Sequence, residues 1–452
     1  MAKFFLLFIP SLLCVFINDP NALYLTAWLG SAYLIILSIY TCKYILNEQI
    51  GFFSPIVLSQ GLFWGYTALT SIFYFIDQHG YEFFERVKPF ANIEEIKLIA
   101  QAQVYIVFAH ACYLTGYYLI KAKRGQPKYL LNFKNNTYFN LSIASAILAA
   151  TLQFAPIAQL SSYLSLFSTI CAVHYFGIAL RQKRHIPLAS IYLISILIIG
   201  FFSGMKENTI YPIIFLGIIA YENYGVFKTS LFFIPLMAIY FYYVPTYNAK
   251  VRESRWYQNK STIEAFDELS NTDFDAEVLK NNNWTFLTDR VSEISMFTTY
   301  LQSVPQKRPY YEFEIVGYGL ASLVPRFIWP DKPSPDATAQ KRAIENGALI
   351  LNYADDTTSA KPQTIVDAYL SYGYLAIAIT YLLFGIVLKL ALNLCYAKLG
   401  YEFGISTIFY CLFSILSRGG CFENLFNTIT YAFILIYVWI EVLKKYKLII
   451  KN

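Results

Sequence analysis

Residues 366–394 read VDAYLSYGYLAIAITYLLFGIVLKLALNL, with Asp367 and Lys389 as the only charged side chains. About 20 apolar residues are enough to cross the hydrocarbon core of a bilayer as a helix. The whole 452-residue chain is similarly apolar, since 57% of it is hydrophobic, 18% aromatic and only 14% charged. Soluble domains carry about 25% charged residues. The sequence therefore predicts an all-α polytopic membrane protein.

Eleven further segments resemble residues 366–394 in apolar character, so the sequence predicts about 12 transmembrane helices. Several are short, and 208–222 contains a proline that could make it a half-span. The predicted spans are about 3–17, 22–42, 52–76, 98–120, 138–157, 160–180, 187–203, 208–222, 229–245, 366–394, 404–417 and 424–443.

The basic residues indicate an orientation, because Lys and Arg concentrate in short cytoplasmic loops. With the N-terminus in the cytoplasm, 17 Lys and Arg residues fall in cytoplasmic segments and five in short outer loops. We therefore expect both termini to be cytoplasmic. The net charge of +6 is scattered between the spans, so it does not indicate nucleic-acid binding.

The spans divide the chain into three regions: an N-terminal transmembrane bundle of about nine spans (1–245), one large extracytoplasmic loop (246–365), and about three C-terminal spans (366–452). A connection of about 120 residues is far longer than usual, and such loops are commonly functional. Within it, apolar residues recur every three or four positions, the period of an amphipathic helix. They are Trp284, Leu287, Val291, Ile294, Phe297, Leu301 and Val304.

The same loop contains residues 323–333, LVPRFIWPDKP, in which three prolines accompany two cations, an acid and a tryptophan. Prolines fix φ and donate no hydrogen bond, so this stretch is expected to be a rigid path rather than a helix or strand. Tryptophan beside Arg and Lys is typical of the membrane–water boundary. The stretch is either a membrane-anchoring loop or part of a site for an anionic, lipid-linked substrate.

The sequence gives little support for a metal site or for disulfide bonds. All seven cysteines lie in or at the edge of apolar segments, and none has zinc-ligand spacing. Asp273-Phe-Asp275 could hold a divalent metal, but its polar, acidic surroundings favour a solvated loop. We expect no metal and no cofactor.

Charged residues at the predicted outer ends of spans are the candidate site, because charge near a bilayer is costly and often functional. Clustered cations suit a pyrophosphate, whose oxygens guanidinium groups bind in pairs. Headgroup anchoring is the alternative for each residue taken alone. The candidate pyrophosphate-binding residues are Lys206, Arg252, Arg255, Arg290, Arg326, Lys332 and Arg418. The candidate catalytic bases are Glu207, Asp331 and Glu423, each of which could instead form a salt bridge with a neighbouring cation.

Four motifs resemble the Wzy-type polymerases of bacterial O-antigen and related exopolysaccharide repeat units. They are LVPRFIWPDKP at 323–333, SGMKENT at 203–209, Asp367-Ala-Tyr-x-x-Tyr-Gly373, and Ser417-Arg-Gly419. The resemblance implies a GT-C-like glycosyltransferase of the bacterial inner membrane that uses no nucleotide. It would transfer a glycan from undecaprenyl pyrophosphate to a sugar hydroxyl of another lipid-linked repeat unit.

The resemblance also implies the partners: undecaprenyl-pyrophosphate-linked oligosaccharide, the lipid bilayer and a chain-length regulator protein. Two other functions stay open. One is a flippase or transporter of lipid-linked oligosaccharide, and the other is an O-antigen ligase, which shares the polymerase's donor.

Overall fold

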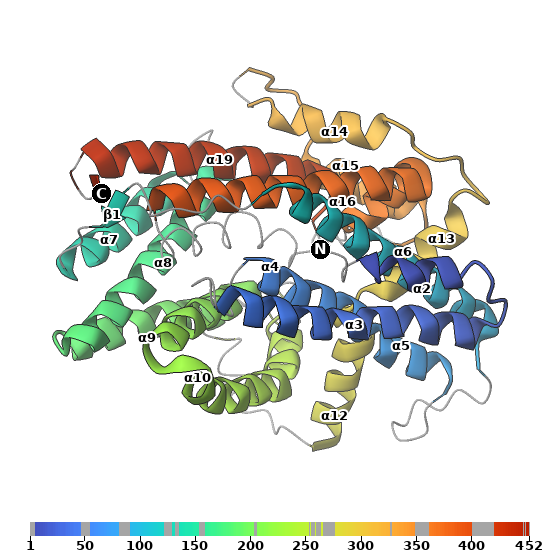
Figure 1. The fold of residues 1–452 in the computed structure, drawn as a ribbon, viewed down its shortest axis with the longest axis horizontal. Helices are drawn as coiled ribbons and strands as arrows, with labels where there is room; N and C mark the ends of the chain where they lie inside the picture. Colours follow the sequence, from blue (N-terminus) through green and yellow to red (C-terminus); the bar gives the residue numbers. More distant parts are fainter. Residues whose placement is uncertain are drawn as a thin grey trace. The chain divides into compact units, whose positions relative to one another are not determined.

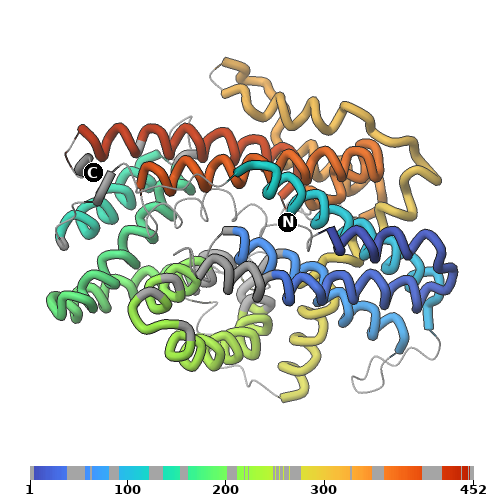
Figure 2. Tube along the Cα trace, in the orientation of Figure 1, coloured from blue at the N-terminus to red at the C-terminus, as the bar shows by residue number. Residues whose placement is uncertain are grey.

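A computed structural model shows a helical protein whose elements can be followed as ribbons in Figure 1 and as a Cα trace in Figure 2. The structure describes residues 5–46, 55–80, 91–121, 129–131, 135–152, 159–202, 206–252, 254, 258, 264, 276–325, 328–348, 361–399, 420–445, 447 and 449–451.

The chain forms two compact units. The first comprises Met1–Pro127, Trp284–Tyr401 and Cys411–Trp439, and the second comprises Lys128–Asn283, Glu402–Tyr410 and Ile440–Asn452. Each unit therefore draws on segments far apart in the sequence.

The first unit is built around helix α6 (Ile93–Leu119), which packs against α2 (Phe8–Leu13), α3 (Pro20–Leu46), α5 (Ser71–Gln78), α13 (Ile294–Ser303) and α16 (Thr364–Leu399). The α6 helix begins at Asn92, whose side chain accepts a hydrogen bond from the backbone N–H of Glu95 at 3.3 Å. Buried residues follow one another along nearly its whole length. A helix that is apolar on all sides is expected to be surrounded by others.

Two glycines allow α6 and α16 to cross closely. A Cβ atom at Gly116 would lie under 3.0 Å from the backbone oxygen of Leu382, and one at Gly385 would lie equally near that of Tyr113. Small residues permit such contacts in membrane helices. A Cβ at Gly61, by contrast, would have no neighbour within 4 Å.

We expect Gly385→Val to lower the free energy of unfolding by about 1–3 kcal/mol, the usual cost of overpacking. The added side-chain atoms would collide with backbone atoms of α6, which cannot move aside as the end of a flexible side chain can. Gly61→Val should have a much smaller effect. Unfolding of the detergent-solubilised protein, followed by its helical circular dichroism, compares the two. Equal stabilities would mean that the α6–α16 crossing is not close in the folded protein.

Helix α16 is broken at Tyr372 and Gly373, where Gly373 has a φ of 57°. Glycine tolerates this left-handed conformation without a steric penalty. The carbonyl groups of Leu370 and Ser371 accept hydrogen bonds from the backbone N–H groups of Tyr311 and Glu312, at 2.9 and 3.1 Å. The segment before α14 (Glu314–Leu323) therefore satisfies polar groups that the break exposes.

The apolar stripe predicted from Trp284 to Val304 is largely buried, but it is not one helix. It passes through the end of α12 (Ala276–Thr285), the π-helix η3 (Phe286–Val291) and α13. Glu293 interrupts the run with a φ of 52°. The spacing of the apolar residues correctly predicted a largely buried face. It could not predict the interruption at Glu293, because the positive φ of that residue leaves no mark on the apolar pattern.

The remaining elements of the first unit are α4 (Pro55–Leu58), the π-helix η1 (Ser59–Leu69), α15 (Pro335–Glu345) and most of α19 (Phe422–Lys445). In the second unit, α7 (Asn135–Leu152) packs on α8 (Gln159–Gln182), which also contacts α9 (Ile186–Phe202) and α10 (Lys206–Arg252). Strands β1 (Tyr129–Leu131) and β2 (Ile449–Lys451) pair antiparallel, with Leu130 opposite Ile450.

Seven helices within the described ranges are long and apolar enough to cross a membrane, so the prediction of twelve was too high. They are Pro20–Leu37, Ile56–Gln78, Ile93–Leu119, Ser161–Gln182, Phe227–Tyr247, Thr364–Leu399 and Phe422–Lys445. The predicted spans 187–203 and 208–222 correspond to shorter apolar helices, Ile186–Gly200 and Tyr211–Tyr221.

The other three predicted spans have different outcomes. Residues 138–157 overlap α7, which is not among the seven. The predicted span 3–17 includes the six-residue α2, and its described part, 5–17, has no helix long enough to cross a membrane. The predicted span 404–417 lies outside the described residues. Within α10, Gly225 has non-helical angles, which separates the segments predicted as 208–222 and 229–245.

Candidate functional site

Arg342 lies at the centre of a buried cluster in the first unit. It belongs to the last turn of α15, whose buried face consists of Ala339, Arg342 and Ala343. Ser334 precedes the helix in an extended conformation and Pro335 opens it, as is common at the first helical position. Arg342 and Ala343 lie three and four residues after Ala339, so all three share one face of the helix. The arginine therefore points inward with the two alanines.

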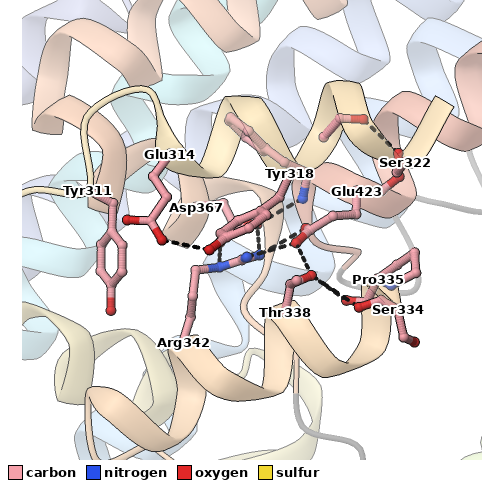
Figure 3. Close-up of polar contacts among 12 residues, drawn as sticks. Tyr311, Glu314, Tyr318, Ser322, Ser334, Pro335, Thr338, Arg342, Asp367 and Glu423 are labelled. Atoms are coloured by element: carbon pink, nitrogen blue, oxygen red, sulfur yellow. Dashed lines mark hydrogen bonds and ion pairs between the residues drawn. The ribbon is translucent and has the colours of Figure 1, made fainter. Parts of the chain in front are cut away.

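The guanidinium of Arg342 forms paired hydrogen bonds with two carboxylates from distant segments (Figure 3). Its Nε and Nη2 donate to Asp367 Oδ1 and Oδ2 at 3.1 and 3.0 Å. Its Nη1 and Nη2 donate to Glu423 Oε1 and Oε2 at 2.7 and 2.9 Å. All three side chains are 0–1% exposed. Planar, two-pronged contacts of this kind are the strongest that arginine makes.

Further donors complete the cluster. The backbone N–H of Phe422 donates to Asp367 Oδ2 at 2.8 Å, and the Thr338 hydroxyl donates to Glu423 Oε1 at 2.7 Å. All four carboxylate oxygens thus accept hydrogen bonds. Burial, the largest influence, lowers the pKa of Arg342, but Asp367 and Glu423 together raise it above the ordinary value. The arginine stays charged between two buried carboxylates.

Lys332 attaches the proline-rich segment, 323–333, to the end of α14, next to the Arg342 cluster. Lys332 is 5% exposed, and its Nζ donates to the backbone oxygens of Ser322 and Val324 at 2.8 and 2.6 Å. These carbonyls belong to the C-terminal end of α14, where the helix leaves them without intrahelical partners. The Ser322 hydroxyl in turn donates to the backbone oxygen of Glu423 at 3.0 Å.

We expect Lys332→Met to reduce the free energy of unfolding by about 1–3 kcal/mol, because it leaves two backbone oxygens without their buried donor. Asp331→Asn changes an exposed neighbour and serves as the control. Detergent-titration unfolding of both variants makes the comparison. A loss no larger for Lys332→Met than for the control would show that this tether does not stabilise the protein.

Of the predicted site residues, the structure places Glu423 in the Arg342 cluster and Lys332 in the neighbouring tether. Arg290 and Asp331 are exposed. The side chains of Lys206, Glu207 and Arg252, on helix α10, lie outside the described residues, as do Arg255, Arg326 and Arg418 altogether. The binding and catalytic roles assigned to these residues stay predictions.

Arg342 was not predicted as a site residue, and Asp367 was noted only within a motif. One signal was available: Asp367 lies at the start of the most hydrophobic span, where an acid needs a partner of opposite charge. The sequence does not say which cation that is. Within the described ranges, no three His, Cys, Asp or Glu side chains gather closely enough to hold a metal ion.

The Arg342 cluster can hold three segments in one arrangement, since it joins α15 to the first turns of α16 and α19. Removing a single member would leave charge buried without compensation. The cluster therefore acts as a positioning element, because its hydrogen-bonding groups face one another and its three charged side chains are buried (Figure 3).

Residues 9–451 match the family model described as "Domain of unknown function (DUF8712)", so the chain belongs to that family. No curated protein and no solved structure matches the chain.

Proposed function

We propose that this member of the DUF8712 family is a membrane glycosyltransferase that polymerises lipid-linked oligosaccharide repeat units. It would work at the outer face of the bacterial inner membrane, with the N-terminus cytoplasmic and the region 246–365 outside. A cytoplasmic C-terminus also requires the predicted span 404–417, between α16 and α19, to cross the membrane. The observation that supports the proposal most is the Arg342 cluster. It lies where the proline-rich segment, the Asp367 motif and the start of α19 come together, and the first two are motifs of the polymerase resemblance.

In the proposed reaction, a sugar hydroxyl of one repeat unit attacks the anomeric carbon of the glycan on another lipid. The bond from that carbon to the pyrophosphate oxygen breaks, and undecaprenyl pyrophosphate leaves with the electron pair. The hydroxyl proton passes to a general base. The energy comes from the lipid pyrophosphate, so no nucleotide and no cofactor is needed.

The proposed roles of individual residues follow the sequence prediction. The cations Lys206, Arg252, Arg255, Arg290, Arg326 and Arg418 would bind the pyrophosphate and stabilise its charge as it departs. Lys332, the seventh predicted cation, is better suited to holding the proline-rich segment, because its ammonium group already donates to two backbone oxygens. Glu207 and Asp331 are the candidate bases. Glu423 is better suited to positioning, because both of its oxygens already accept hydrogen bonds from Arg342.

A flippase for the same lipid-linked substrate is the second candidate. The observation that favours it is the break in α16 at Tyr372 and Gly373, because discontinuous helices commonly form transporter sites. A ligase that transfers the finished glycan remains a third, chemically related function.

A deletion strain distinguishes the three functions. Loss of a polymerase should leave surface glycan with a single repeat unit, and the wild-type gene should restore long chains. Intact lipid-linked polymer with no surface glycan would indicate a ligase instead. Accumulation of single units on the cytoplasmic side would indicate a flippase, and either of these results would overturn the proposal.

A further inference from the structure

One face of helix α14 is apolar and exposed. Phe313, at the N-terminal boundary, and Leu320 are 73% and 53% exposed, and the exposed Gly317 lies between them. Positions four and three apart share a helix face. The opposite face, with Ile315 and Gly319, is buried. The helix therefore has one apolar side packed against the first unit and a second apolar side that the described part of the first unit does not cover.

Two contacts place α14 at the beginning of two candidate membrane spans. A Cβ at Gly319 would lie 2.7 Å from the ring of Phe426, so α14 packs directly on the first turns of α19. The Phe313 ring lies 5.4 Å from that of Tyr372, edge to face, at the break in α16. Both partners are near the N-terminal ends of their helices, which is where a span meets the surface of the bilayer.

Further exposed apolar side chains lie close in sequence to these contacts, on α16 and after α14. Beyond the break, Tyr374 and Leu375 on α16 are 48% and 64% exposed. After α14, Ile328 and Trp329 are 65% and 42% exposed. Tyrosine and tryptophan are enriched where a membrane protein passes from hydrocarbon to water. An apolar face that runs into a candidate span is the surface that lipid would cover.

We propose that α14 lies in the plane of the membrane interface, with Phe313 and Leu320 inserted among the lipids. Its occupant is the bilayer itself. The helix reads EIVGYGLASL and contains no Lys or Arg, so insertion depends on burial of apolar surface rather than on anionic headgroups. Glu314 sits at the N-terminal end, where its carboxylate accepts a hydrogen bond from the Tyr318 hydroxyl at 2.7 Å.

This inference goes beyond the proposed function and does not depend on it. An interfacial α14 would hold the Arg342 cluster at the depth of the headgroups, since Ser322 of α14 bonds directly to Glu423. A transporter or a ligase with the same structure would have the same interfacial helix.

Photo-crosslinking of the full chain tests the proposal. A benzophenone amino acid is placed at Phe313 or at Leu320, and for comparison at Ala337, an exposed position of α15. The protein is reconstituted in phosphatidylcholine nanodiscs, irradiated, and analysed by mass spectrometry. We expect lipid adducts several-fold more abundant at positions 313 and 320 than at 337, and unchanged when anionic lipid is added.

Two outcomes would overturn the proposal. Lipid adducts at 313 and 320 no more abundant than at 337 would place α14 in water. Covalent dimers of the chain formed from either position would mean that a second copy covers this face. Because all three positions are exposed, the probe is not expected to prevent folding.

Discussion

Arg342→Met is expected to lower the free energy of unfolding by about 3–5 kcal/mol, the cost of breaking a buried ion pair by removing one partner. The methionine fills much of the arginine's volume but leaves Asp367 and Glu423 facing each other without their shared cation. Detergent-titration unfolding of the purified protein measures the loss. In a complemented deletion strain, the same variant should produce little or no long glycan.

Arg308→Met is the matched control, because Arg308 is 46% exposed and pairs with Glu345 across 3.8 Å. Exposed pairs contribute about 0–1 kcal/mol. A second variant isolates the cause: combining Arg342→Met with Asp367→Asn and Glu423→Gln removes the uncompensated charge and should recover part of the stability. Equal losses for Arg342→Met and Arg308→Met would contradict the account of the cluster.

Asp367→Asn should cost about 2–3 kcal/mol, the range expected when a charged hydrogen bond is lost and a buried donor is left unpaired. Asp367 accepts from Arg342 Nε, Arg342 Nη2 and the backbone N–H of Phe422. An asparagine at this position must turn its own NH2 group toward at least one of these donors. The change therefore disturbs both the guanidinium and the start of α19.

Asp336→Asn provides the same chemical change on an exposed residue, one that pairs with Lys361 at the start of α15. Its effect should be within about 1 kcal/mol. Thermal unfolding in the same detergent compares the two variants. If Asp367→Asn proved as stable as Asp336→Asn, the contacts of Asp367 would not hold α16 to α15 and α19.

The helical class of the fold and seven of its candidate spans could be predicted from apolar runs, because length and hydropathy decide whether a segment can cross a bilayer. The total of twelve was too high, since short runs such as 3–17 and 208–222 pass a count of apolar residues but form shorter helices. The break in α16 was not predicted, because hydropathy does not report the left-handed φ of Gly373.

The candidate site was predicted in part. Glu423 was selected because it is an acid at the end of a span, and the structure places it in a buried cluster. Arg342 could not be found in this way, since it lies in a polar segment where one arginine resembles any other. Its role depends on tertiary contacts with residues 25 and 81 positions away. Lys332 was selected for its charge, whereas the structure shows its ammonium bound to backbone oxygens.

Polymerisation by the purified protein is the most direct test of the proposed function. The chain is reconstituted in liposomes with undecaprenyl-pyrophosphate-linked repeat units extracted from the deletion strain, with no nucleotide sugar added. We expect the wild-type protein to produce a ladder of lipid-linked glycans of increasing length. The Arg308→Met variant should produce the same ladder, and the Arg342→Met variant should not. Single repeat units that remain unextended with the folded wild-type protein would contradict the proposed function.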